Sequence, residues 1–146
     1  MHANASLTEI VRWLDGQLDV AAYASEPDSN GLLYQSPAGD GVSKFAVAVN
    51  TSLTTIVGAA RAGANLLVVH HAPWAAVDLH LREEKLAALE AAGLSLYGAH
   101  AALDCAPRFG NGWVLAALLG VEVTDTFGEY HGGNCGVIGT PGAASF

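Results

Sequence analysis

In Leu66-Leu67-Val68-Val69-His70-His71, four apolar residues run directly into two histidines. A continuous apolar run of this length is typical of a strand that is covered on both faces, as in a parallel sheet. A second run, Leu96-Tyr97-Gly98-Ala99-His100, follows a helix that stops at Gly93 and leads to Asp104. Parallel strands end at the same edge of a sheet, where open α/β sheets place their ligands. The polar side chains at the two strand ends are therefore expected to converge.

Imidazoles and a carboxylate together suit a divalent metal such as zinc, iron or manganese. The candidate ligands are His70, His71, His100 and Asp104. Adjacent histidines on an extended chain point to opposite faces, so they serve two neighbouring metals more easily than one. A His-His pair alone is often a structural feature of a strand end. The second polar cluster at a similar strand end favours a metal site with one or two ions.

The composition predicts a cytoplasmic globular protein that forms homo-oligomers. A chain of 146 residues fits one domain. The hydrophobic fraction of 51% against a charged fraction of 14% indicates burial in subunit interfaces as well as in the core. The net charge of −8 argues against nucleic acid or an anionic membrane as a partner. The sequence has no long apolar run, no signal-peptide pattern and too few cysteines for a disulfide framework.

A helix, a strand and a second helix are predicted before the first histidine run. Ser6 and Glu9 form a capping box ahead of apolar residues at helical spacing, which predicts a helix over residues 7–18. Residues 45–49 are apolar and predict a strand. The helix after that strand has an apolar stripe and is expected to stop at Gly63.

Between the two histidine runs, Asp78 is expected to cap a helix over residues 79–92, with Lys85 on its solvent side. The resulting order of strand, helix, strand, helix, strand indicates a parallel α/β sheet with right-handed crossovers. Farther along, a helix is expected over residues 113–119. The glycine-rich stretch 128–142 is expected to form a hairpin or an edge strand followed by a loose tail.

Four motifs occur in order along the chain, at residues 28–32, 67–73, 98–104 and 110–120. In turn, they resemble the Asn-Gly-Leu motif, the His-His-Pro signature, the His-x-x-Leu-Asp signature and the Gly-Asn-Asn stretch of the Nif-three-like family. Bacterial members of that family are often labelled GTP cyclohydrolase type 2 homologues. The resemblance extends over most of the chain, and two spaced histidine signatures make it specific.

The resemblance implies one α/β domain over residues 1–146, with a mixed or parallel sheet flanked by helices. It also implies a dinuclear metal site at the C-terminal strand ends and assembly as a toroidal hexamer. By residue-for-residue match, His70, His71 and Asp104 are metal ligands, Asp104 can bridge two metals, and His100 is a ligand or its close partner. The expected function is divalent-metal binding, with hydrolysis of a small nucleotide-like substrate. The alternatives are a non-catalytic metal-binding or oligomeric scaffold protein with an incomplete site, and a metal-trafficking role.

The sequence also departs from the family pattern. Family members carry a second half with a further His and Glu, and this chain corresponds to the N-terminal half only. Glu129 and His131 are the nearby candidates to replace those ligands, but their spacing does not match. Asn50 stands where the family has an aspartate, Ala72 interrupts the His-His-Pro signature, and Gly112 replaces an asparagine. These departures favour the scaffold alternative.

Overall fold

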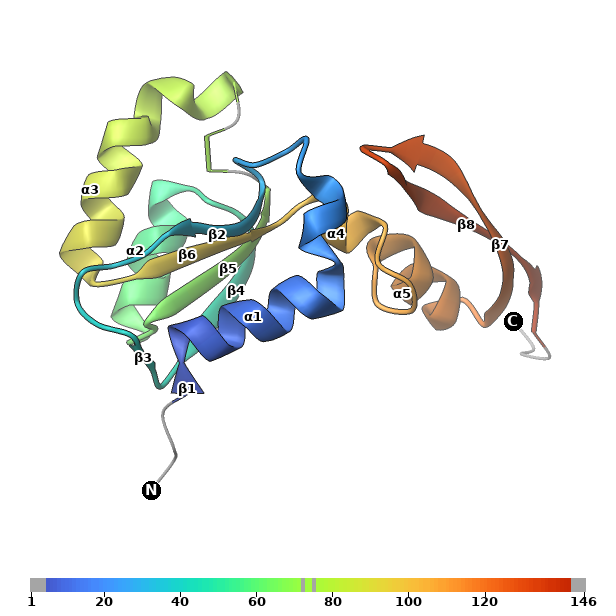
Figure 1. The fold of residues 1–146 in the computed structure, drawn as a ribbon, viewed down its shortest axis with the longest axis horizontal. Helices are drawn as coiled ribbons and strands as arrows, with labels where there is room; N and C mark the ends of the chain where they lie inside the picture. Colours follow the sequence, from blue (N-terminus) through green and yellow to red (C-terminus); the bar gives the residue numbers. More distant parts are fainter. Residues whose placement is uncertain (1–4, 72, 75, 143–146) are drawn as a thin grey trace.

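The computed structural model describes residues 5–71, 73–74 and 76–142. A four-stranded sheet in the order β2-β6-β5-β4 lies at its centre (Figure 1). The strands are β2 (Asn30–Tyr34), β4 (Phe45–Asn50), β5 (Leu66–His71) and β6 (Ser95–Ala99). β4, β5 and β6 are parallel, and β2 pairs antiparallel with β6. The predicted mixed α/β fold is confirmed.

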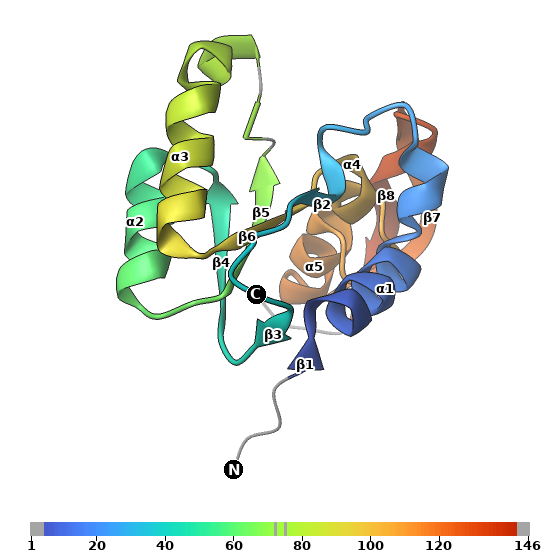
Figure 2. The same cartoon turned by 60° about the vertical axis from the view of Figure 1, so that its left-hand side comes forward.

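Helices cover both faces of the sheet, as Figures 1 and 2 show together. α1 (Leu7–Leu18) lies on one face, and α2 (Leu53–Arg61) and α3 (Arg82–Ala92) lie on the other. Beyond the sheet, α5 (Asn111–Leu118) leads into a hairpin of β7 (Val121–Tyr130) and β8 (Gly133–Pro141). The short elements are β1 (Ala5–Ser6), η1 (Val20–Tyr23), β3 (Gly41–Val42), η2 (Ala76–Leu81) and α4 (Ala101–Asp104). No helix in these described ranges has the length and apolar character that a membrane crossing requires.

Side-chain alternation along β5 divides the core into two layers. Leu66 and Val68 pack into the layer beneath α1, whereas Leu67 and Val69 pack into the layer beneath α2 and α3. Successive residues of a strand point to opposite faces, so a strand covered on both sides needs a continuous apolar run. The position of β5 between β4 and β6 explains why its sequence has this form.

β4 is an edge strand of the sheet, as is β2, and the described residues leave one face of β4 uncovered. Phe45, Val47 and Val49 have exposed fractions of 61%, 73% and 59%. They lie on the same face as Leu66 and Val68 of β5, because Phe45 pairs with Leu66 and Val47 with Val68. α1 covers β5 and β6 on this face but leaves an apolar hollow of about 430 Å³ over β4.

The segment before α3 differs from the sequence prediction. The predicted helix over residues 79–92 begins only at Arg82, after the 3-10 helix η2, and Asp78 is not its cap. The carboxylate of Asp78 accepts a hydrogen bond from the Lys85 ammonium at 3.0 Å instead. A nearby opposite charge stabilises a buried ammonium more than a cap stabilises one helix end.

Lys85 is buried, so its predicted place on the solvent side is wrong. Its exposed fraction is 1%, and its ammonium also donates to the Pro73 carbonyl oxygen at 2.9 Å. The long aliphatic stem packs among apolar residues while the charged end reaches two oxygens. Lys85 thereby ties α3 to the segment that follows the histidine pair.

Replacing Lys85 with methionine keeps the apolar stem and removes both hydrogen bonds. We expect the free energy of unfolding in urea to fall by about 1–3 kcal/mol, because the Pro73 carbonyl stays buried without a donor. Lys44→Met is the matched control, since Lys44 donates to the Ala62 carbonyl at 2.9 Å from an exposed position. Water replaces that bond, so stability should change by less than about 0.5 kcal/mol. Equal losses in the two variants would contradict the role of Lys85.

Candidate metal site

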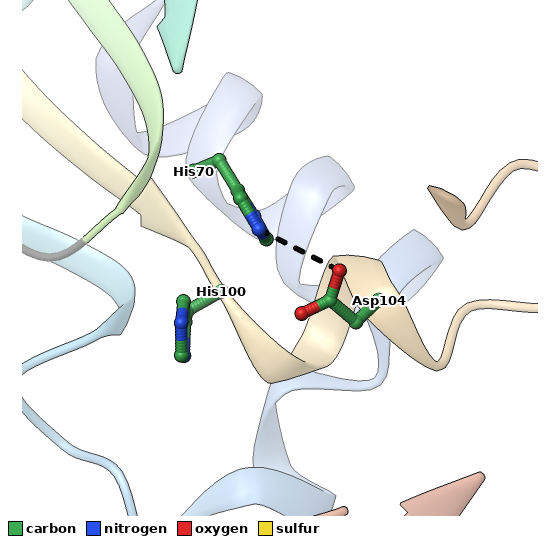
Figure 3. Close-up of side chains that lie close together, drawn as sticks. All are labelled: His70, His100 and Asp104. Carbon is green, nitrogen blue, oxygen red and sulfur yellow. Dashed lines mark ion pairs between the residues drawn. The ribbon is translucent and has the colours of Figure 1, made fainter. Parts of the chain in front are cut away.

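Three of the four predicted ligands lie together at the C-terminal edge of the sheet (Figure 3). His70 is the last residue but one of β5, His100 follows β6, and Asp104 ends α4. One potential ligand atom from each lies within 4.8 Å of the others. The side chains are 17% to 21% exposed, so the cluster is shielded but open to small ions.

The imidazole of His70 is held in one tautomer. Its Nδ1 lies 2.8 Å from the carbonyl oxygen of Ala99, which can only accept a hydrogen bond, so Nδ1 carries the proton. In the neutral ring, Nε2 then has a free lone pair, and it lies 3.5 Å from Oδ1 of Asp104. Two facing electron-pair donors are stabilised only by a cation between them, either a proton or a metal ion. Two ligands of a tetrahedral zinc ion lie roughly 3.4 Å apart, which fits this separation.

The backbone of His100 is held by Asn30, the asparagine of the Asn-Gly-Leu motif. Its side-chain oxygen accepts hydrogen bonds from the amides of His100 at 2.9 Å and Ala102 at 3.1 Å. These amides lie where β6 turns into α4, so Asn30 satisfies groups that no strand or helix partner reaches. Gly31 has a φ of 91°, which favours glycine after this buried asparagine.

The carboxylate of Asp104 is held by the Gly110-Asn111 motif. Nδ2 of Asn111 donates to Oδ1 of Asp104 at 2.5 Å. A Cβ at Gly110 would meet the carbonyl oxygens of Leu103, Asp104 and Ala106 at 2.6 to 2.8 Å, so glycine is needed for this close approach. Asn111 is predicted as a turn or cap residue. In the structure it begins α5 and orients a candidate ligand.

His71 lies beside the cluster but does not share its group of ligand atoms. β5 ends at His71, and the imidazole of His71 lies on the side of the cluster, with its ring centroid 6.1 Å from that of His100. The ring centroid of His71 is 4.8 Å from that of His70. Its Nδ1 donates to the side-chain oxygen of Asn50 at 2.5 Å, and the residue is exposed. The role of His71 as a ligand stays a prediction, and Ala72 of the same signature lies outside the described residues.

Sequence analysis missed Glu26, a partly buried carboxylate beside the cluster. One of its oxygens lies 3.2 Å from Nδ1 of His100 and the other 3.2 Å from Nε2 of His131. Glu26 lies in a turn-rich loop whose composition predicts only a change of chain direction. His131 is in the turn of the β7–β8 hairpin, whereas Glu129 is exposed on β7. No local sequence pattern links the loop that carries Glu26 to the hairpin turn that carries His131.

Three neighbouring groups stay neutral around pH 7. Burial raises the pKa of the Cys105 thiol, and a protonated thiol is a poor metal ligand. Burial and a hydrogen bond with Cys105 raise the pKa of Tyr23 to about 12. Burial, with the nearby carboxylates of Glu26 and Asp104, also raises the pKa of Tyr130.

The chain is similar to proteins from bacteria and archaea. A protein of Deinococcus radiodurans called GTP cyclohydrolase 1 type 2 homolog is 39% identical over 137 residues, which are 90% of this chain and 50% of that protein. A protein of Pyrococcus horikoshii with the same name is 40% identical over 134 residues, with 90% and 52% covered. The chain spans about half the length of these curated relatives.

Solved structures show the same fold. Protein ybgI, described as of unknown function, matches with a TM-score of 0.71 and 31% identity, covering 84% of this chain and 50% of that one. TTHA1606 from Thermus thermophilus matches with a TM-score of 0.68 and 29% identity over the same shares. A family model, Duf34/NIF3 (NGG1p interacting factor 3), matches residues 5–144. The chain therefore belongs to the Duf34/NIF3 family.

Proposed function

We propose that the chain binds a divalent metal ion, such as zinc, iron or manganese, through His70, His100 and Asp104. The observation that carries this proposal is the facing pair of His70 Nε2 and Asp104 Oδ1, 3.5 Å apart. His70 donates a hydrogen bond from Nδ1 to the Ala99 carbonyl, and Asp104 accepts one from Asn111, so both groups are held in place. Ligands oriented in this way are typical of metal centres, where the outer partners fix the tautomer and the direction of each ligand.

A second ion next to the first is part of the proposal. A carboxylate has two oxygens to share, so Asp104 can contact two ions. His71 supports the second position, because its ring lies next to that of His70 and its Nε2 is free of the bond to Asn50. The other coordination positions are left for water or for groups outside this chain.

The reaction that this site supports best is metal-dependent hydrolysis of a small nucleotide-like substrate. A cation with three protein ligands keeps a position for water and supplies the Lewis acidity that makes water nucleophilic near neutral pH. A hollow of about 410 Å³ adjoins His70, with Val47, Val49, Val68 and Leu103 among its apolar walls. Apolar walls beside a polar cluster suit a flat ring that carries polar groups. The name of the relatives, GTP cyclohydrolase 1 type 2 homolog, agrees with such a substrate class.

Metal content tests the binding site directly. In protein purified without chelator or affinity metal, mass spectrometry should find at least one divalent ion per chain. Asp104→Asn should lose it, because an amide is a weak ligand for these ions. Asp125→Asn makes the same change on an exposed residue of β7 and should keep the metal. Wild-type protein without metal, or Asp104→Asn protein with full metal, would contradict the site.

Hydrolysis is tested on the metal-loaded protein with GTP and simpler phosphate and cyclic amide substrates. Product release should depend on added metal, stop with a chelator, and fall to background in His100→Gln protein. His80→Gln removes an exposed histidine of η2 and should retain full activity. Activity that persists in His100→Gln protein at the wild-type rate would rule out this site as its source.

A non-catalytic oligomeric scaffold is the second candidate, and the uncovered face of β4 favours it. Phe45, Val47 and Trp13 are each more than half exposed and line one apolar hollow. Contiguous apolar surface of this kind marks an interaction site, and an unpaired edge strand can pair with its own copy. We propose that a second copy of this chain covers it within a homo-oligomer, for which the family resemblance implies six subunits.

Light scattering after size exclusion checks this assembly. The wild-type chain should elute as an oligomer, and Val47→Lys should shift it toward the monomer, because a buried ammonium opposes association. Val57→Lys places the same charge on an exposed position of α2, on the opposite face of the sheet, and should leave the mass unchanged. A monomeric wild-type chain would exclude the scaffold. An oligomer that binds metal but turns over no substrate would support it over the hydrolase.

A further inference from the structure

Glu26 lies outside the group of candidate ligands, yet both of its carboxylate oxygens are occupied. Oε2 accepts from Nδ1 of His100 at 3.2 Å and from Nδ2 of Asn30 at 3.4 Å. Oε1 lies 3.2 Å from Nε2 of His131. The side chain is only 14% exposed. A largely desolvated carboxylate is costly without hydrogen-bond donors, and the bond from Nδ1 of His100 meets this need and fixes the proton of that ring.

The bond to Glu26 determines which nitrogen of His100 can bind a cation. A carboxylate only accepts, so Nδ1 of His100 carries the hydrogen and Nε2 keeps the free lone pair. The Ala99 carbonyl has the same effect on His70, so both candidate ligands present Nε2. A carboxylate that accepts from a metal-binding imidazole also makes that imidazole a stronger ligand.

The same carboxylate connects the site to the turn of the β7–β8 hairpin. His131 has a φ of 52° in that turn, a conformation that non-glycine residues seldom adopt. The Tyr130 ring packs edge-on against the His131 ring, with their centroids 4.4 Å apart. The centroid of the Tyr130 ring is 6.0 Å from that of His100. A Cβ at Gly133 would clash with the Tyr23 hydroxyl and lie 2.8 Å from Cβ of Cys105, so the turn packs closely on η1 and on the end of α4.

We infer that Glu26 is a positioning residue of the metal site, and that its close contact with the imidazole of His131 fastens the hairpin turn beside that site. This inference rests on the proposed metal binding. Glu26 acts through His100, whose ring it orients in the metal-free protein as well as in the loaded one. The hairpin turn is thereby connected to the site through Glu26.

A zinc titration against a competing chromophoric chelator tests the effect on binding. Glu26→Gln should raise the dissociation constant for zinc roughly tenfold to a hundredfold, the usual effect of losing such an outer partner. Glu129→Gln makes the same change on an exposed residue of β7 and should leave the constant unchanged. Equal zinc affinities for wild-type and Glu26→Gln protein would overturn the role of Glu26.

Nitrogen NMR of the imidazole rings, on metal-free protein at pH 8, gives a readout independent of the metal. In the wild-type chain, His100 should show the tautomer with its proton on Nδ1, and Glu26→Leu should remove that preference. An unchanged His100 tautomer in Glu26→Leu protein would also overturn the inference. If wild-type protein binds no zinc but His100 still responds to Glu26→Leu, the metal site fails while the Glu26–His100 bond stands.

The hairpin link is tested separately by hydrogen exchange. His131→Gln keeps a polar side chain that can contact Glu26, although its shape differs from that of an imidazole. His131→Leu has no polar group to contact Glu26. We expect the backbone amides of residues 130–134 to exchange at least about tenfold faster in His131→Leu protein than in the wild type. The exchange rate of His131→Gln protein should lie between the two. Exchange at the wild-type rate in both variants would overturn the fastening of the turn.

Discussion

The register of β5 against β6 is the constraint on which the candidate site depends. Val69 pairs with Gly98, so His70 comes to lie beside Ala99 and its Nδ1 reaches the Ala99 carbonyl. A shift of one residue would turn His70 to the opposite face of the sheet. Gly98 also allows β2 to approach, since a Cβ there would lie 2.5 Å from the Ser29 carbonyl oxygen. Close packing of the sheet thus positions both the histidine and the loop that carries Asn30.

Each candidate ligand has an outer partner from a different part of the chain. His70 depends on a backbone carbonyl, His100 on Glu26, and Asp104 on Asn111. Two of the motifs, those that contain Asn30 and Asn111, therefore hold candidate ligands in place and do not supply them. This arrangement explains why Asn30 and Gly110 lie in sequence motifs although neither belongs to the ligand cluster.

Local sequence signals were sufficient for much of this fold. The capping box of Ser6 and Glu9 is present, and the apolar run into His70 forms the buried central strand. The convergence of His70, His100 and Asp104 followed from parallel strand order alone. The failures have a common cause, because they concern side chains whose partners are set by tertiary structure. The sequence around Lys85 is typical of a solvent-exposed helix face, and only the tertiary structure shows that its ammonium has buried partners.

Glu26 is the clearest case of that limit. Its contact with His100 joins residues 74 positions apart, and no periodicity or spacing rule covers such a distance. Asn30 reaches the His100 amide over 70 positions in the same way. A sequence motif can mark these residues as special, but only the packed loop reveals which atom each one serves.

The distances along the chain between the ligand-bearing segments also have a thermodynamic consequence. His70 and the carbonyl that orients it are 29 positions apart, so an unfolded chain does not present the ligands together. An ion that binds this site binds the native state and not the unfolded chain. At a concentration a hundred times its dissociation constant, it raises the free energy of unfolding by about 2.7 kcal/mol. For a domain of ordinary stability, that is a substantial share of the total. The supply of the ion would then set how much of the protein survives, apart from any chemistry it performs.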